Sequence, residues 1–321
     1  MTTTREVTLA DIVAAQRRLR PHLPPSPLRA SPWLSHRTGA VVTLKLESVQ
    51  FTNSFKIRGA LNAMLRLAET DRGATVVTAS AGNHGRAMAF AGERLGLRTI
   101  VFTPATAPQT KRAAIAQHGA ELHAEAPDYD EAERRAREYA EQTRAVYISP
   151  YTHPDVIAGA GTVALELLQS TLFDTVVVPI GGGGLASGMA IALKHAAPDV
   201  KVLGVEVDAS RPFAASLGRG VIVEIEVKPS LADGLTGNLE PGAITFQYVR
   251  RFVDEVTSVS EESLRAAIRE LAREEHLIVE GAGAAATAAV LSRDVIAPGA
   301  RAVVLVTGGN IDVGTFASCL V

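Results

Sequence analysis

Short apolar segments alternate with helical segments along most of the chain, and this alternation is the feature that most limits the fold. One series runs over residues 75–148 and a second over residues 162–306. Strand–helix alternation is typical of a mostly parallel sheet covered by helices. We therefore expect an α/β protein with two lobes, each containing a mostly parallel sheet flanked by helices.

Three loops rich in glycine or small polar residues directly follow expected strands: residues 80–85, 181–184 and 307–310. In open sheets of this type, ligands bind beyond the carboxyl ends of the strands. These loops are therefore the candidate binding segments.

The second of these loops carries the strongest single signal. Four consecutive glycines, Gly181, Gly182, Gly183 and Gly184, stand between a valine-rich strand and a helix. Exposed backbone N–H groups at the start of a helix bind phosphate well. The same loop also matches a dinucleotide pattern through Gly181, Gly183 and Ala186, with Glu206 ending the next strand. A nicotinamide or flavin oxidoreductase is therefore an alternative from a different enzyme class.

The other two loops are weaker signals. Asn83 and His84 open a helix after Ser80, which suits a carboxylate ligand but also suits a structural turn. The segment 307–310 could be only a turn after a buried strand. Glu280 is an acid in apolar surroundings, and it could be a site residue or part of a capped turn.

A lysine lies at the expected start of another helix. Ser54 can cap the first turn of a helix that carries Lys56 and buries Leu61, Met64 and Leu65 on one face. Partial burial and nearby backbone N–H groups lower the pKa of an amine, which makes it a usable nucleophile. Lys56 is therefore a candidate for covalent chemistry.

The composition of the chain limits its expected partners and its expected cellular compartment. The formal net charge of -2 gives no electrostatic argument for nucleic acid or an anionic membrane as partner. Cys319 is the one cysteine, so no intrachain disulfide can form. The polar start of the chain does not match a signal peptide, and no apolar run of about 18 residues occurs. We expect a cytoplasmic protein.

Taken together, the motifs resemble those of the pyridoxal-phosphate (PLP) enzymes of the tryptophan-synthase-β fold type. Within that group they are most similar to the threonine/serine dehydratase and serine racemase branch. The resemblance extends in family order from about residue 28 to residue 312. It rests on these segments: Ser-Phe-Lys-Ile-Arg-Gly at 54–59, Ser-Ala-Gly-Asn-His-Gly at 80–85, Gly-Gly-Gly-Gly-Leu at 181–185 and Thr-Gly-Gly-Asn at 307–310.

The resemblance implies a role for each matching residue. Lys56 would hold PLP as a Schiff base and later remove the substrate Cα proton. Phe55 would pack on the pyridine ring, Asn83 would bind the ring's 3-oxygen, and Thr307 would meet the ring nitrogen. Glu280 is a further expected cofactor neighbour. The remaining implied contacts are the phosphate cradle, Gly181, Gly182, Gly183, Gly184 and Leu185, and the substrate carboxylate site, Ser80, Ala81, Gly82, Asn83 and His84.

The resemblance also implies an organisation and a reaction. Residues 1–68 and 148–321 would form a large PLP-binding domain and residues 69–147 a small domain, within a homodimer. A hydroxyl such as that of Thr307 does not stabilise a protonated pyridine nitrogen, which favours β-elimination over transamination. The expected activity is therefore removal of water from L-threonine, L-serine or a related β-hydroxy amino acid, which yields a 2-oxo acid and ammonia.

Departures from the family pattern separate the alternatives within the branch. Racemases of this branch carry a serine where this chain has Ala81, which cannot carry a proton, so serine or amino-acid racemisation is the weaker alternative. Dehydration of β-hydroxyaspartate stays open. The family's divalent-cation site begins with an acid matched by Glu206, but its second acid aligns with Pro212, so we expect no metal.

Overall fold

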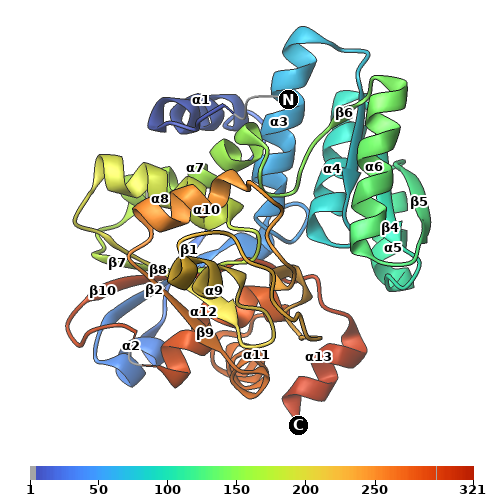
Figure 1. Ribbon diagram of the computed structural model, residues 1–321. Helices are drawn as coiled ribbons and strands as arrows, with labels where there is room; N and C mark the ends of the chain where they lie inside the picture. The colour runs from blue at the N-terminus through green and yellow to red at the C-terminus, as the bar shows by residue number, and fades with distance from the viewer. Residues whose placement is uncertain (1–4, 294) are drawn as a thin grey trace. The chain divides into compact units, whose positions relative to one another are not determined.

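The computed structural model describes residues 5–293 and 295–321 (Figure 1). The chain divides into two compact units. The described part of unit 1 comprises residues 5–23 and 56–160, and unit 2 comprises Pro24–Phe55 and Gly161–Val321. The expectation of a large domain at 1–68 and 148–321 with a small one at 69–147 stays a prediction about domain boundaries.

Unit 1 contains a four-stranded parallel sheet in the order β5-β4-β3-β6. Its strands are β3 (Thr75–Ala79), β4 (Arg98–Pro104), β5 (Glu121–Ala126) and β6 (Val146–Tyr147). Its helices are α1 (Leu9–Leu19), α3 (Lys56–Thr70), α4 (Asn83–Leu95), α5 (Gln109–Ala116), α6 (Tyr129–Thr143) and the first part of α7 (Pro154–Ser170).

Side-chain alternation along these strands separates the two faces of the sheet. Val77 and Ile100 pack with Ala132 and Ala136 of α6, whereas Val101 packs with residues of α4 and α5. Successive side chains of a strand point to opposite faces. Helix α6 therefore covers one face and helices α4 and α5 cover the other, as can be followed in Figure 1.

Unit 2 contains a six-stranded sheet in the order β1-β2-β10-β7-β8-β9, in which only the β1–β2 pair is antiparallel. Its strands are β1 (Leu28–Ala30), β2 (Val41–Leu46), β7 (Thr175–Pro179), β8 (Lys201–Val207), β9 (Glu255–Val259) and β10 (Arg301–Val306). Its α-helices, besides the second part of α7, are α2 (Pro32–Thr38), α8 (Gly184–Ala196), α9 (Pro212–Arg219), α10 (Ile244–Phe252), α11 (Glu261–Glu275), α12 (Gly281–Ser292) and α13 (Val313–Leu320). Two short 3-10 helices are Glu47–Val49 and Asp233–Leu235.

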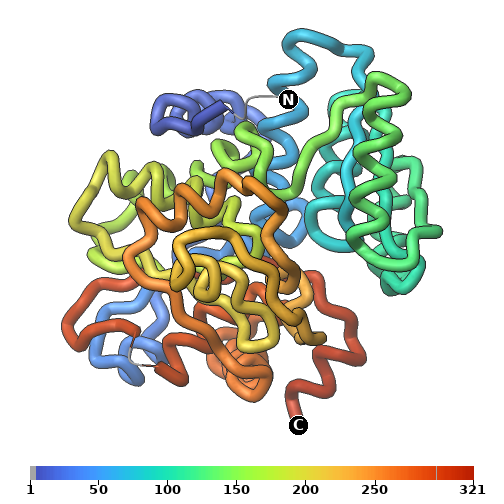
Figure 2. Tube along the Cα trace, in the orientation of Figure 1, coloured from blue at the N-terminus to red at the C-terminus, as the bar shows by residue number. Residues whose placement is uncertain are grey.

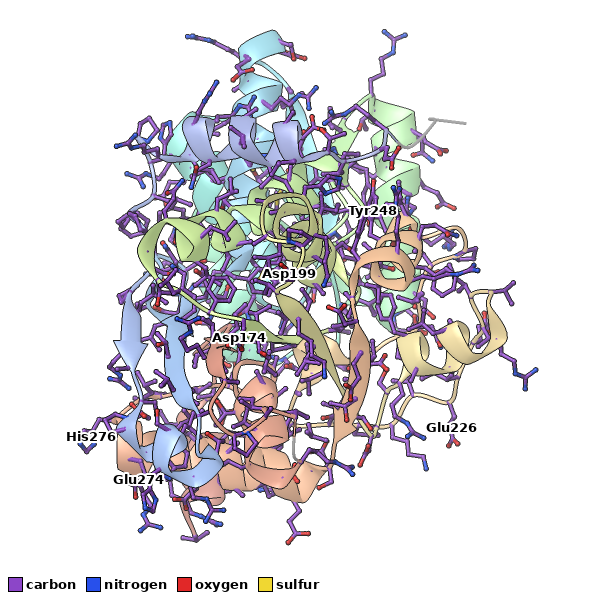
Figure 3. All side chains as sticks on the ribbon, turned by 90° about the vertical axis from the view of Figure 1, so that its left-hand side faces the viewer. Asp174, Asp199, Glu226, Tyr248, Glu274 and His276 are labelled. Carbon is purple, nitrogen blue, oxygen red and sulfur yellow. The ribbon has the colours of Figure 1, made fainter. Side chains whose placement is uncertain are left out.

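Helix α12 forms the centre of the unit 2 core. Its residues from Gly281 to Val290 are all buried, and they pack against α11 and against strands β7 to β10. A helix that is apolar on every side is stable only when it is buried on every side. At the amino ends of the strands, Asp174, labelled in Figure 3, accepts a hydrogen bond from the Arg301 backbone N–H at 2.9 Å and thereby joins β7 to β10.

The observed architecture confirms the expected α/β class with two mostly parallel sheets. The sequence at residues 221–239 gives no clear pattern of helix or strand, and in the structure it forms loops with only the short 3-10 helix Asp233–Leu235, whose path is visible in Figure 2. None of the helices in the described ranges combines the length and the apolar character that crossing a bilayer requires.

Candidate active site

Lys56 is the first residue of α3 in unit 1 and has a fixed position. Its Nζ donates a hydrogen bond to the Pro150 carbonyl at 3.1 Å, and the residue is half-buried. The first turn of α3 is pressed against α7, because a Cβ added to Gly59 would lie 2.8 Å from the Val156 carbonyl oxygen. The close approach that Gly59 allows holds the lysine backbone in place.

The predicted cap of this helix is wrong. Ser54 does not cap α3, since its buried hydroxyl has no hydrogen-bond partner in the described structure. Ser54 instead forms an isolated β-bridge with Gly308 in unit 2. Long-range pairing has replaced the local cap that the sequence pattern indicated.

The loop at residues 80–85 leads from β3 into α4, as expected. Gly82 is the residue before the helix, and no side chain caps the helix start there. The Ser80 hydroxyl accepts a hydrogen bond from the Gly82 N–H at 3.2 Å, while Ala81, Gly82 and Asn83 are half-buried. A helix start without a side-chain cap is suited to a carboxylate.

His84 is buried in the same loop, with 2% of its surface exposed. Burial lowers the pKa of His84 well below its ordinary value, the charge of Lys56 lowers it further, and the Ile148 backbone partly offsets the effect. Neither ring nitrogen meets hydrogen-bond geometry with a partner in the described residues. His84 is therefore a neutral imidazole near the Lys56 amine.

Unit 2 brings Phe55 together with the Thr307 loop. The Phe55 N–H donates to the Thr307 carbonyl at 3.0 Å, and the Gly309 N–H donates to the Asn53 carbonyl at 2.9 Å. Asn53 has a φ of +54°, which asparagine tolerates better than most residues. The Thr307 hydroxyl donates to the Ala282 carbonyl at 3.2 Å. The Ser-Phe segment before Lys56 is thus anchored on the loop that holds Thr307.

Glu280 belongs to the same neighbourhood. Its N–H donates to the Gly308 carbonyl at 3.2 Å, and only 8% of its surface is exposed. It precedes α12, and its carboxylate makes no capping bond to the helix start. The interpretation as a capped turn is therefore wrong, and Glu280 stays a candidate site residue.

Residues 181–184, called the glycine loop below, join β7 to α8. Gly183 has a φ of +85°, and a Cβ added there would lie 2.5 Å from Cζ of the Phe213 ring. A Cβ on Gly181 would lie 2.9 Å from the Gly234 carbonyl oxygen. No side chain caps the start of α8. The loop therefore presents backbone N–H groups and a helix dipole to an anion.

Comparison with known proteins identifies the family and its cofactor. Residues 19–308 match the family described as "Pyridoxal-phosphate dependent enzyme". This chain belongs to the pyridoxal-phosphate dependent enzymes. The family match sets aside the nicotinamide or flavin alternative and confirms pyridoxal phosphate as the cofactor.

Individual relatives show to which branch of the PLP family this chain is most similar. The chain is 42% identical to the L-threonine ammonia-lyase of Thermotoga maritima over 309 residues, which are 96% of this chain and 76% of the relative. Among solved structures, a threonine deaminase from T.th. has a TM-score of 0.88 at 36% identity and covers 95% of this chain and 99% of its own. Maize serine racemase has a TM-score of 0.91 at 31% identity, covering 98% and 97%. The predicted dehydratase and racemase branch is confirmed.

Each of the two units supplies residues whose chemistry fits PLP. Unit 1 supplies a held primary amine, Lys56, which can bind an aldehyde. Unit 2 supplies an anion cradle for a phosphate in the glycine loop and a buried neutral hydroxyl, Thr307.

One candidate residue was missed by sequence reasoning. Thr245 is fully buried, and its hydroxyl has no hydrogen-bond partner in the described structure. Its Cβ lies 3.1 Å from the position that a Cβ on Gly183 would take. Thr245 is therefore a further polar group beside the glycine loop. Its sequence neighbourhood carries no signal, because the contact joins segments 62 residues apart (245 − 183).

Proposed function

We propose that this chain is a PLP-dependent ammonia-lyase that removes water from L-threonine, L-serine or a related β-hydroxy amino acid. The observation that carries the proposal is the similarity over 96% of the chain to an L-threonine ammonia-lyase. The 36% identity to the catabolic L-threonine dehydratase of Escherichia coli, over 95% of this chain and 94% of the relative, supports the same activity.

In this proposal each cofactor contact has a named residue. Lys56 would bind the cofactor covalently, Phe55 would pack on its ring, and Asn83 would bind its 3-oxygen. Thr307 would meet the ring nitrogen, and Glu280 would be a further cofactor neighbour. The backbone N–H groups of the glycine loop and of Leu185 would bind the phosphate.

The loop before α4 holds the substrate carboxylate. Ser80, Ala81, Gly82, Asn83 and His84 form this loop, and the uncapped start of α4 favours a negative group. A neutral His84 can donate a hydrogen bond without adding a charge. The loop thus orients the substrate so that its Cα–H faces a base.

When bound, PLP supplies an electron sink that acidifies the Cα–H bond of an amino acid. Once the substrate amine has replaced it on the cofactor, the free Lys56 amine would accept the Cα proton as general base. The electron pair of that bond would form the Cα–Cβ double bond, and the β-hydroxyl would leave as water with one proton, so that the proton accepted by Lys56 balances the one taken up by the leaving oxygen. The released enamine tautomerises to an imine, whose hydrolysis gives a 2-oxo acid and ammonia.

Thr307 favours this outcome over reactions that need a long-lived carbanion. A hydroxyl cannot stabilise a protonated ring nitrogen as a carboxylate does, so charge at Cα is dispersed less well. The Thr307 hydroxyl has one proton, and the bond to the Ala282 carbonyl uses it. Its donation to a ring nitrogen therefore requires that the hydroxyl turns away from Ala282.

Release of 2-oxo acid from a panel of β-hydroxy amino acids tests the proposal. We expect turnover of L-threonine or L-serine and none of L-alanine, which has no β-leaving group. A protein that binds PLP and releases no 2-oxo acid from any member of the panel would contradict the proposal.

Racemisation is a second candidate, because the maize serine racemase structure is closely similar. Protonation of Cα from the opposite face needs a second acid, and the methyl group of Ala81 cannot supply one. Chiral analysis of recovered substrate is expected to show little D-enantiomer relative to 2-oxo acid. Conversion mainly to the D-enantiomer would favour the racemase.

The proposal also covers the oligomeric state of the protein and its location in the cell. We infer a homodimer from the family resemblance, which a mass measurement in solution tests. We also infer a cytoplasmic location, and the free, buried Cys319 is compatible with a reducing compartment.

A further inference from the structure

Glu206 is a buried carboxylate, one residue before the end of its strand, that binds two backbone N–H groups of α9. It lies in β8 with 1% of its surface exposed. Its Oε1 accepts from the Phe213 N–H at 2.7 Å, and its Oε2 accepts from the Ala214 N–H at 3.0 Å. Both oxygens of the carboxylate are thus used within unit 2.

These two bonds hold the start of α9. The helix begins at Pro212, which has no N–H, and Arg211 before it makes no side-chain cap. Phe213 and Ala214 are the second and third helix residues, the positions at which capping groups bind. Glu206 therefore does from a neighbouring strand what a local cap residue does in other helices.

Phe213 connects this cap to the glycine loop. Its side chain is fully buried, and its ring leaves no room for a Cβ on Gly183. A shift of the first turn of α9 would move the ring away from the Gly183 backbone against which it lies. The position of Glu206 therefore affects the glycine loop through the Phe213 side chain.

A cation at this place does not fit the residues. The family pattern would place a second acid at position 212, where this chain has proline. Among the described residues, no group of three or more His, Cys, Asp or Glu side chains could hold a metal ion. The Glu206 oxygens already bind N–H groups that a cation would have to displace.

We propose that Glu206 is a positioning residue that fixes the glycine loop for phosphate through Phe213, without a metal ion. Burial raises the pKa of Glu206 to about 7, and the N–H groups of Ala214 and Phe213 act in the opposite direction, as expected for groups bound to the carboxylate. The inference rests on the proposed function, because it assumes that the glycine loop binds the cofactor phosphate.

The test compares PLP with pyridoxal, which lacks the phosphate, in binding titrations of the cofactor-free full chain. In Glu206→Gln we expect PLP affinity to fall about tenfold and pyridoxal affinity to stay within about twofold. A general loss of stability would weaken both ligands alike. Equal effects on the two ligands, or no effect on PLP, would overturn the inference.

Three controls make the comparison specific. Glu275→Gln removes another buried carboxylate of unit 2, which pairs with Arg29 at 2.7 Å, and should leave the ratio of PLP to pyridoxal affinity unchanged. Phe213→Leu keeps Glu206 and should lower PLP affinity selectively, so it tests the inference even if Glu206→Gln fails to fold. Addition of Mg²⁺ or a chelator should not change PLP affinity, and a cation dependence that Glu206→Gln abolishes would overturn the metal-free role.

The two proposals fail in different ways. If PLP does not attach to Lys56 in the unsubstituted protein, the proposed function fails. If PLP attaches to Lys56 in every variant and the affinity ratio stays constant, only the role of Glu206 fails.

Discussion

Gly183 is under two separate constraints at the residue scale. Its φ of +85° is strained for any residue with a Cβ, and the Phe213 ring occupies the space that a Cβ would need. Gly220 has a similar φ of +73° but no atom within 4 Å of an added Cβ. Alanine substitutions at Gly183 and Gly220 therefore separate the cost of backbone strain from the cost of steric overlap.

Gly183→Ala is expected to lower the free energy of unfolding by about 2–5 kcal/mol, as the sum of strain and overpacking. It should also weaken PLP binding, because the loop must move. Gly220→Ala should cost only about 1–2 kcal/mol and leave PLP binding unchanged. Urea denaturation and PLP titration measure both, and equal costs for the two variants would show that the Phe213 contact has no effect.

His84 makes stability depend on pH in a defined direction. Burial, and then the charge of Lys56, hold the pKa of His84 well below its ordinary value of 6.5. Below that pH the unfolded chain binds a proton at this residue that the folded chain does not bind. The free energy of unfolding should therefore fall as pH drops below about 6.5, by up to about 1.4 kcal/mol per pH unit.

His84→Gln should flatten this part of the stability profile. The pKa of His153 is also lowered by burial, so some dependence on pH should remain. Denaturation of both proteins across this pH range gives the difference due to His84. Parallel profiles would mean that His84 titrates alike in the folded and unfolded states.

At the scale of elements, a buried ion pair ties β2 to the second part of α7. Lys45, with 1% exposure, binds Glu166 at 2.6 Å and the Ser26 carbonyl at 2.8 Å. A buried charge that loses its partner is costly, whereas an exposed pair contributes little. The exposed pair of Lys201 and Glu255, at 3.1 Å, provides the comparison.

Glu166→Gln is expected to cost about 3–5 kcal/mol of unfolding free energy, because Lys45 stays buried with its charge uncompensated. Glu255→Gln should cost less than about 1 kcal/mol. Thermal or urea denaturation distinguishes them. Similar small costs would indicate that water or another group compensates Lys45 in the variant.

Elements were predictable where the local signal agreed with the tertiary structure. The spacing of Thr8 and Asp11 predicts a helix start, and a capping box of these two residues forms at the start of α1. The prolines at positions 21, 24, 25 and 27 predict an extended link as far as Trp33, and they give no sign of helix α2, which Ser31 caps and Gly39 ends. Ser54 was misassigned since its β-bridge partner, Gly308, is distant in the sequence.

The features of the candidate site also differ in whether a local sequence signal indicates them. The lysine and the glycine loop could be proposed from the sequence because their chemistry depends on short contiguous segments. Thr245 and the connection from Glu206 through Phe213 were not, because each depends on contacts between separate elements. Sequence patterns report what a segment can do, and packing determines which of those options is used.

At the scale of the whole molecule, the account depends on a single covalent attachment. The family match shows the cofactor to be pyridoxal phosphate, and we propose Lys56 as the residue that binds it, because the segment 54–59 resembles the lysine motif of the family. That lysine is held in unit 1 by the Pro150 carbonyl, while the phosphate cradle and Thr307 belong to unit 2. If the attachment is elsewhere, the roles of the other residues lose their basis.

Mass spectrometry of the protein after borohydride reduction tests this attachment most directly. The account predicts one pyridoxyl adduct, on the peptide that contains Lys56, and its loss in Lys56→Ala but not in the surface control Lys201→Ala. An adduct on a different lysine, or no adduct in protein purified with PLP, would contradict it.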